Sequence, residues 1–314
     1  MMRRRDFLIG TGAAIAAPNI ARADATVIKM GALKLIHSIA PYFYEKFAPA
    51  GYRIEVIPFE SPTEGKNAVV TKSVDYGMFG IAAATLGAAA GEPIVVIASA
   101  CNKGMAVIAA KDAPIAAIKD LKGKRVGIWP GSTQEVFILE RLRMEGMSVA
   151  DITPVRIFFS EMHLALAHGD IDAYVGAEPG PSVSLASGVG KLVEYPYGTN
   201  MGALNMVFGA RRDTTTGNPE LTKIILEIHR RASEFAMANP NEMAAMTVAK
   251  LGQKREAVEI AVPNVELTWK FGPKEIQQAK TYAEHMLELK QIKQLPDFAT
   301  FFDTRFVAAM EKAA

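Results

Sequence analysis

Polar and aromatic residues that could bind a small molecule follow several of the predicted strands. They are His37, Ser38, Phe79, Gly80, Asn102, Trp129, Ser132, Thr133, Glu161, His163 and Glu178. Loop amides, helix N-termini and single side chains at strand ends are the groups that hold a ligand in a binding protein. The pattern places no nucleophile beside a base, so we expect binding and assign no catalytic residue.

The stretch from Lys124 to Gly146 has the form of a strand, a tight turn and a helix. Ser132 or Thr133 is a suitable N-cap for this helix, and Glu135 is spaced for a capping box. The free amides at such a helix start favour an anionic or polar group. The alternative is a purely structural unit, because many α/β proteins contain similar turns.

Several candidates have a structural alternative that the sequence leaves open. His37 is equally a surface loop histidine, Gly80 a packing glycine and Trp129 a plug at the edge of a domain. Glu178 would repel an oxyanion unless a cation pairs with it. It therefore favours a ligand that carries an amine, a hydroxyl or a ring nitrogen.

Cysteine and histidine usage argues against metal chemistry. Cys101 is the only cysteine, and the five histidines form no close His/Cys run. A lone cysteine excludes an intramolecular disulfide, and this spacing predicts no metal cluster. We therefore expect neither a metal nor another cofactor.

The first 23 residues have the form of an export signal. Arginines at Arg3–Arg5 precede Phe7 and a short apolar stretch, and Ala21-Arg22-Ala23 is a small-x-small cleavage site. The Arg-Arg-x-Phe-Leu core resembles a twin-arginine signal, and a general secretory signal is the alternative. Both routes lead to the periplasm.

The charge balance changes when this signal is removed. Four arginines and one aspartate leave with it, so the 35 basic and 33 acidic residues of the chain become 31 and 32. The near-neutral mature protein has no polybasic patch that would indicate nucleic acid or a membrane surface as a partner. No later stretch is long enough for a transmembrane span, so we expect a soluble monomer.

The mature chain alternates strands and helices and becomes almost purely helical after Arg212. The predicted strands are Thr26–Leu33, Tyr52–Phe59, Tyr76–Gly80, 93–100, Met105–Ala110, 125–129, 154–159, Ala173–Ala177, 192–195 and 204–209. The predicted later helices are Pro219–Ala238, 241–251, Arg255–Ala261, 273–289 and 296–311. Such alternation favours parallel-type sheets with helices on their faces.

The helical tail must pack on an earlier layer, and we expect it to wrap back on the first sheet. This predicts an α/β fold with two doubly wound lobes, in which residues 24–109 and 209–314 form lobe 1 and residues 110–208 form lobe 2. The chain would then cross twice between the lobes. The cleft at such a hinge is the expected ligand site, since ligands bind beyond the carboxyl ends of strands.

Four motifs carry a resemblance to a known family. They are HSIAPYFYEKF (37–47), GKNAVVTKSVDYGMFG (65–80), DLKGKRVGI (120–128) and HLALAHGDIDAYVGAEP (163–179). In this order, behind an export signal, the chain resembles the substrate-binding components of ABC importers in the nitrate, sulfonate, taurine and thiamine-precursor group. The resemblance covers nearly the whole mature chain.

This resemblance implies a periplasmic receptor of the type II periplasmic-binding-protein fold, which closes on a small ligand and presents it to a membrane permease and its ATPase. Pyrimidine-precursor synthases share the fold, but they would need an iron-binding His/Cys cluster. A ligand-sensing protein without a transporter is a second alternative. Few cationic side chains lie in the candidate loops, which argues against a bare nitrate or sulfonate as the ligand, although helix N-termini can hold oxyanions without cations. A small organic anion and an aromatic heterocycle are the ligands left open.

Overall fold

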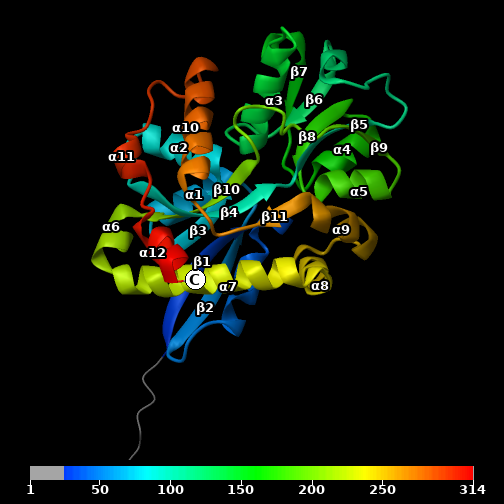
Figure 1. The fold of residues 1–314 in the computed structure, drawn as a ribbon. Coiled ribbons are helices and arrows are strands. Elements are labelled where there is room, and N and C mark those ends of the chain that lie inside the picture. The colour runs from blue at the N-terminus through cyan, green and yellow to red at the C-terminus, as the bar shows by residue number, and fades with distance from the viewer. Residues whose placement is uncertain (1–24, 314) are drawn as a thin grey trace, which may run out of the picture.

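Two β-sheets form the framework of the protein (Figure 1). The computed structural model describes residues 25–313, so the export signal predicted at residues 1–23 lies outside the described residues. The strands are β1 (Thr26–Leu33), β2 (Tyr52–Phe59), β3 (Tyr76–Gly80), β4 (Ile94–Lys103), β5 (Met105–Ala110), β6 (Arg125–Ile128), β7 (Thr153–Arg156), β8 (Ala173–Ala177), β9 (Gly190–Glu194), β10 (Leu204–Arg211) and β11 (Val265–Leu267).

Helices cover the faces and edges of both sheets. The α-helices are α1 (Pro62–Val70), α2 (Ile81–Ala89), α3 (Thr133–Met144), α4 (Met162–His168), α5 (Gly180–Ala186), α6 (Arg212–Gly217), α7 (Pro219–Ala238), α8 (Pro240–Leu251), α9 (Arg255–Ala261), α10 (Pro273–Glu288), α11 (Phe298–Phe301) and α12 (Arg305–Ala313). Five short 3₁₀ helices are η1 (Ile36–Ser38), η2 (Ala40–Lys46), η3 (Ile118–Leu121), η4 (Val149–Asp151) and η5 (Val262–Asn264). The stretch between β1 and β2 thus forms a pair of 3₁₀ segments, with Pro41 in the first turn of the second.

Both sheets are mixed, which corrects the expected parallel-type architecture. The first sheet has the order β11-β4-β10-β3-β1-β2, and the second has the order β7-β6-β8-β5-β9. The pairs β1–β2, β1–β3, β6–β7 and β6–β8 are parallel. Strands β5 and β10 each come directly after a crossing between the sheets, and each runs antiparallel to both of its neighbours. Strand type was predictable from residue pattern, but strand direction depends on where the chain re-enters a sheet.

The crossings between the sheets lie a few residues from the expected positions at about 109 and 208–209. Strand β5 pairs in the second sheet and β10 pairs in the first, so the chain leaves the first sheet at Gly104 and returns between Glu194 and Leu204. The break between the two strands is visible in the sequence at Asn102-Lys103-Gly104. The sheet in which β5 pairs is decided by tertiary packing, which the hydrophobic pattern does not encode.

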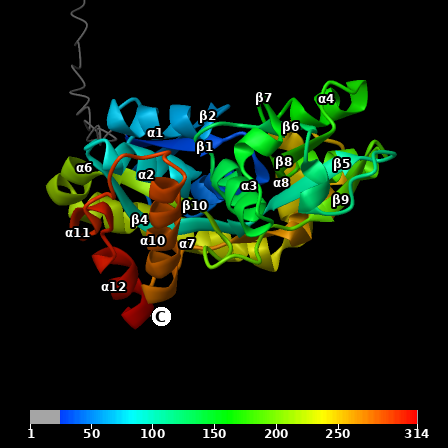
Figure 2. The same ribbon diagram turned by 90° about the horizontal axis from the view of Figure 1, so that it is seen from above.

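Much of the carboxy-terminal region packs on the first sheet, whereas α9 packs on α5 in the second sheet's layer. Helix α7 packs on η2, α10 on α2 and β10, and α11 and α12 on β4. Figure 2 shows α10 beside α2 and also beside α3, which belongs to the second sheet's layer. The region is almost purely helical, as expected, and it also contains β11, a three-residue strand that pairs antiparallel with β4 and is too short to give a periodic signal.

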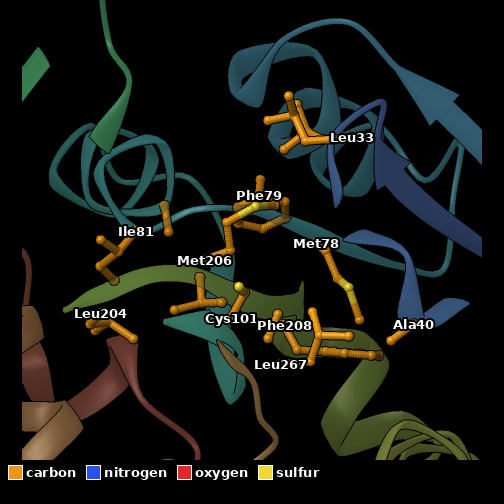
Figure 3. Close-up of a cluster of buried hydrophobic side chains, with 14 of the residues drawn as sticks. Leu33, Ala40, Met78, Phe79, Ile81, Cys101, Leu204, Met206, Phe208 and Leu267 are labelled. Atoms are coloured by element: carbon orange, nitrogen blue, oxygen red, sulfur yellow. The ribbon is translucent and has the colours of Figure 1, made fainter. Parts of the chain in front are cut away.

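A continuous hydrophobic core joins the first sheet to its helices (Figure 3). Close packing at its centre requires glycine at Gly209, because a Cβ there would lie 2.2 Å from the ring of Phe79. Phe208 and Met206 of β10 and Met78 of β3 are fully or almost fully buried in the same cluster. This rigid core fixes the strand ends from which the candidate site is built.

Candidate ligand site between the sheets

A cavity of about 290 Å³ lies between the ends of strands from both sheets. One wall comes from Lys34 and Leu35, which follow β1, and from Glu60, which follows β2. The opposite wall comes from the loop after β7 and from residues 177–180 at the end of β8. Since β1, β2, β7 and β8 each have a parallel neighbour, these are the carboxyl ends at which ligands bind in α/β proteins. We call this cavity the cleft.

The end of α8, with Lys250 and Leu251, and the turn after it, with Gln253, supply a third side of the cleft. Lys34 forms an ion pair with Glu60, and the carboxylate raises the pKa of Lys34. Lys250 has no acidic partner within residues 25–313, and its ammonium lies 5.4 Å from the centre of the Tyr42 ring. The cleft therefore has one cation in excess, which suits an anionic ligand group.

His163 is the predicted site residue that lines the cleft directly. It lies in the first turn of α4 and is half-buried, and burial lowers the pKa of its imidazole. Its Nδ1 is buried and has no hydrogen-bond partner among the described residues. Glu161, the N-cap of the same helix, is exposed to solvent and does not line the cavity.

Glu178 lies between two cleft-lining residues, but its side chain is turned into the protein. Its Oε1 accepts a hydrogen bond from Asn264 Nδ2 at 2.9 Å, and its Oε2 accepts one from the backbone N–H of Ser182 at 3.2 Å. Burial raises the pKa of this carboxyl group. Because these bonds hold the carboxylate away from the cleft lining, Glu178 is not placed to contact an oxyanion bound there.

His37 and Ser38 are buried rather than exposed in a loop. Both ring nitrogens of His37 lack a partner among residues 25–313, and burial lowers the pKa of the imidazole to about 4. The ring lies against Gly104, where an added Cβ would be 2.1 Å from His37 Nε2. The hydroxyl of Ser38 lies 3.9 Å from Met206 Sδ. His37 thus packs against the crossing between the sheets.

Gly104 is the point at which three parts of the chain meet. Its N–H donates to the carbonyl of Asn264 at 2.9 Å, and its carbonyl accepts from the N–H of Glu178 at 2.9 Å. Its φ of +77° is unfavourable for residues with a side chain. The neighbouring Lys103 carbonyl accepts from Asn205 Nδ2 at 2.6 Å. These bonds tie the crossing to the second sheet and to the carboxy-terminal region.

The turn before α3 adopts the predicted N-cap but uses its polar groups within the protein. Ser132 Oγ accepts from the N–H of Glu135 at 3.1 Å, and the Glu135 carboxylate accepts from the N–H of Gly131 at 2.7 Å. Thr133 Oγ1 donates to the carbonyl of Asn205 at 3.2 Å. A Cβ on Gly80 would lie 2.5 Å from Thr133 Oγ1, so the starts of α2 and α3 are in contact. These groups join the two sheets' layers and are already engaged.

Three further candidates lie apart from the cleft lining. The ring of Trp129 stacks on Phe158 with centroids 4.1 Å apart, and its Nε1 has no partner among the described residues. The ring of Phe79 is packed in the core of the first sheet, which favours the structural alternative for this residue. The side-chain amide of Asn102 faces Glu266 of β11, 3.4 Å from its carboxylate.

Several lining residues escaped the sequence reasoning. Lys34 follows the first strand and could have been found by the strand-end argument that selected His37. Lys250 and Gln253 could not, because tertiary packing of the α8–α9 turn against the second sheet's layer brings them to the cleft. Within residues 25–313, no three His, Cys, Asp or Glu side chains are grouped as metal ligands would be. None of the helices in that range has the length and hydropathy that a membrane crossing needs.

The chain matches a known family and several curated proteins. The family model described as NMT1/THI5 like matches residues 43–243, more than half of the chain. An Escherichia coli K12 protein named for binding aliphatic sulfonates is 23% identical over 241 residues, covering 76% of this chain and 75% of that protein. The riboflavin-binding protein RibY of Chloroflexus aurantiacus is 26% identical over 256 residues, covering 74% of this chain and 71% of RibY.

Solved structures share the fold. The alkanesulfonate-binding protein SsuA of Xanthomonas axonopodis pv. citri, bound to MOPS, has a TM-score of 0.80 at 19% identity, covering 90% of this chain and 99% of that chain. The desulfurization enzyme DSZB has a TM-score of 0.70 at 14% identity, covering 92% of this chain and 100% of that chain. The chain belongs to the NMT1/THI5-like family, and its fold is that of the type II periplasmic substrate-binding proteins.

Proposed function

We propose that the protein is the solute-binding component of an ABC importer and captures a small organic anion, such as a sulfonate, in the cleft between the two sheets. The observation that carries this proposal is the cleft itself, which is walled by strand ends of both sheets and contains Lys250, a cation without an acidic partner among residues 25–313. The name of the Escherichia coli relative, which refers to aliphatic sulfonates, supports the same ligand class.

The cleft has the composition expected for ligand capture. It combines donors, from Lys250, His163 and Ser160, with the apolar surfaces of Leu35 and Phe159. Pockets with a few convergent polar groups in an apolar lining are the usual form of small-molecule sites. We infer that the lobes divide at Gly104 and between β9 and β10, and that they close on the bound ligand.

We also propose the cellular setting. The mature protein would reach the periplasm by the twin-arginine route, act as a monomer without catalysis, and deliver its ligand to a permease and its ATPase. Its curated relatives reported above are named as binding proteins, which supports binding over catalysis. DSZB shares the fold, so the absence of turnover is to be measured as well as the presence of binding.

A thermal-shift panel tests the proposed function on the mature protein. The panel contains alkanesulfonates, taurine, nitrate, bicarbonate, riboflavin, pyrimidines and aromatic acids. A ligand at about 100 times its Kd adds roughly 2.7 kcal/mol of stability, which corresponds to a rise in Tm of about 5 °C. We expect that rise with sulfonates. A rise in Tm confined to riboflavin or the pyrimidines would show that the ligand is a heterocycle and not an organic anion. No rise in Tm with any compound of the panel would refute the assignment.

Replacing Lys250 by alanine should weaken sulfonate binding about tenfold, because one charge-assisted hydrogen bond to the anion is lost. The measurement is isothermal titration calorimetry of the parent and of Lys250→Ala. Lys119→Ala is the matched control, since Lys119 is exposed and does not line the cleft. If both substitutions weaken sulfonate binding equally, or if neither weakens it, the role given to Lys250 is contradicted.

A further inference from the structure

We propose that the cleft continues into an apolar chamber that binds the hydrocarbon tail of an amphipathic organic anion. A second cavity, of about 430 Å³, lies between α4 and α5 on one side and the α8–α9 turn and α9 on the other. We call it the tail chamber. This inference rests on the proposed function, because it assigns the anionic head of the ligand to the cleft.

The tail chamber adjoins the cleft at two shared residues. His163 and Gln253 line both cavities, so their side chains stand at the junction. The buried, unpartnered Nδ1 of His163 is available there to a polar group within the part of the chain that the structure describes. A ligand whose head is bound beside Lys250 and His163 can therefore extend past the junction into the chamber.

The lining of the tail chamber is chiefly apolar. Leu164 of α4, Val183 and Ala186 of α5 and Ala257 of α9 contribute hydrocarbon surface. Leu164 is 50% exposed, so its side chain is accessible to a ligand in the chamber. A methylene chain placed against these side chains would remove both its own surface and theirs from water.

The charges of the two cavities differ, and this difference sets the orientation of the ligand. The tail chamber contains one cation, Lys254, and one anion, Glu256, so its charges balance. The cleft has Lys250 in excess. An anionic head is attracted to the cleft, whereas the neutral chamber favours an uncharged tail.

Both walls of the tail chamber belong to elements that pack together. Helix α9 packs directly on α5, and Figure 1 shows α9 beneath α5 at the lower edge of the second sheet's layer. The turn before α9 carries Gln253 and Lys254 and begins with Gly252 at φ +67°. The chamber is thus flanked by helices on both sides and opens to solvent.

Chain length of the ligand tests this inference. Isothermal titration calorimetry of the mature protein with ethanesulfonate and with octanesulfonate compares two ligands that share a head group. Each buried methylene should improve affinity roughly fourfold, equivalent to about 0.8 kcal/mol. With several methylenes in the tail chamber, we expect octanesulfonate to bind roughly 100-fold more tightly than ethanesulfonate.

A charge placed in the tail chamber should remove that preference. In Leu164→Asp we expect the octanesulfonate preference to fall below about tenfold, while ethanesulfonate affinity stays within about twofold of the parent. Leu192→Asp is the matched control, because Leu192 is an exposed leucine of the same sheet's layer that lines neither cavity. The control should keep the full preference.

The possible outcomes separate this inference from the proposed function. Equal affinity of the parent for the two sulfonates would overturn the tail chamber and leave the proposed function intact. An equal loss of preference in Leu164→Asp and Leu192→Asp would also overturn it. Failure of the parent to bind either sulfonate would refute the proposed anion ligand, and the tail chamber with it.

Discussion

Acidification from pH 7 to pH 4 should lower the free energy of unfolding by on the order of 6 kcal/mol through two buried histidines. Burial lowers the pKa of His37 and of His229 from 6.5 to about 4. Between these values the unfolded chain binds a proton at each site and the folded protein does not. Stability is therefore present above pH 6.5 and is lost as the pH falls toward 4, by roughly 3 kcal/mol for each histidine.

The surroundings of the two histidines explain why protonation is unfavourable. His229 Nε2 donates to the Ser99 carbonyl at 2.8 Å, and its Nδ1 accepts from the Tyr44 hydroxyl at 2.9 Å. A proton on Nδ1 would remove that acceptor inside the core. His37 is fully buried, and no acidic partner within residues 25–313 compensates a charge on its ring. A buried charge without a partner is costly.

Urea denaturation at pH 7, 6, 5 and 4 measures this effect. His229→Gln keeps a donor and an acceptor but does not titrate, so we expect its loss of stability to be smaller than that of the parent by roughly 3 kcal/mol. His168→Gln is the control, since His168 is exposed on α4, and it should lose as much as the parent. Glu178, whose pKa is raised by burial, acts in the opposite direction, and comparison between variants cancels its contribution. A parent and a His229→Gln variant with identical pH dependence would contradict the assignment.

Most elements of the fold were predictable because their patterns are local. The strands Thr26–Leu33, Tyr52–Phe59 and Met105–Ala110 and the helix Pro219–Ala238 have the predicted bounds, which are confirmed. In each, a run of residues that favour the element is bounded by a proline, a glycine or a helix cap. Strand β11 escaped prediction because three residues carry no period, and its place beside β4 is decided by packing of the carboxy-terminal region.

The candidate site was predictable in position but less so in its members. The strand-end argument led to His163 and to the neighbours of Glu178, which lie at the cleft. It also selected Ser132, whose hydroxyl accepts a hydrogen bond from an amide of its own helix. The capping pattern that marks a helix start in a sequence also satisfies amides of that start, so these amides are not free for a ligand. Lys250 lies at the end of α8, far along the chain from the strand ends that form the cleft. Its contribution depends on tertiary packing that no local pattern encodes.

Substitution of Gly104 by alanine should lower the free energy of unfolding by roughly 2 to 5 kcal/mol. Two causes add: a left-handed backbone costs a residue with a side chain about 1 to 2 kcal/mol, and overpacking costs about 1 to 3 kcal/mol. The φ of Gly104 is +77°, and the new Cβ would lie 2.1 Å from His37 Nε2. Because Gly104 also bonds Asn264 and Glu178, a shift there disturbs the crossing between the sheets.

A control glycine separates the two causes. Gly146 has φ +72° and no heavy atom within 4 Å of an added Cβ, so Gly146→Ala should show only the backbone cost of about 1 to 2 kcal/mol. In the double variant His37→Ala/Gly104→Ala the clash is removed. Its loss of stability should then be smaller than the sum of the two single losses by about 1 to 3 kcal/mol. Urea denaturation of the four variants at pH 7 provides these values. Additive losses would show that His37 and Gly104 do not contact each other at the crossing, and equal losses in Gly104→Ala and Gly146→Ala would reduce the effect to backbone conformation alone.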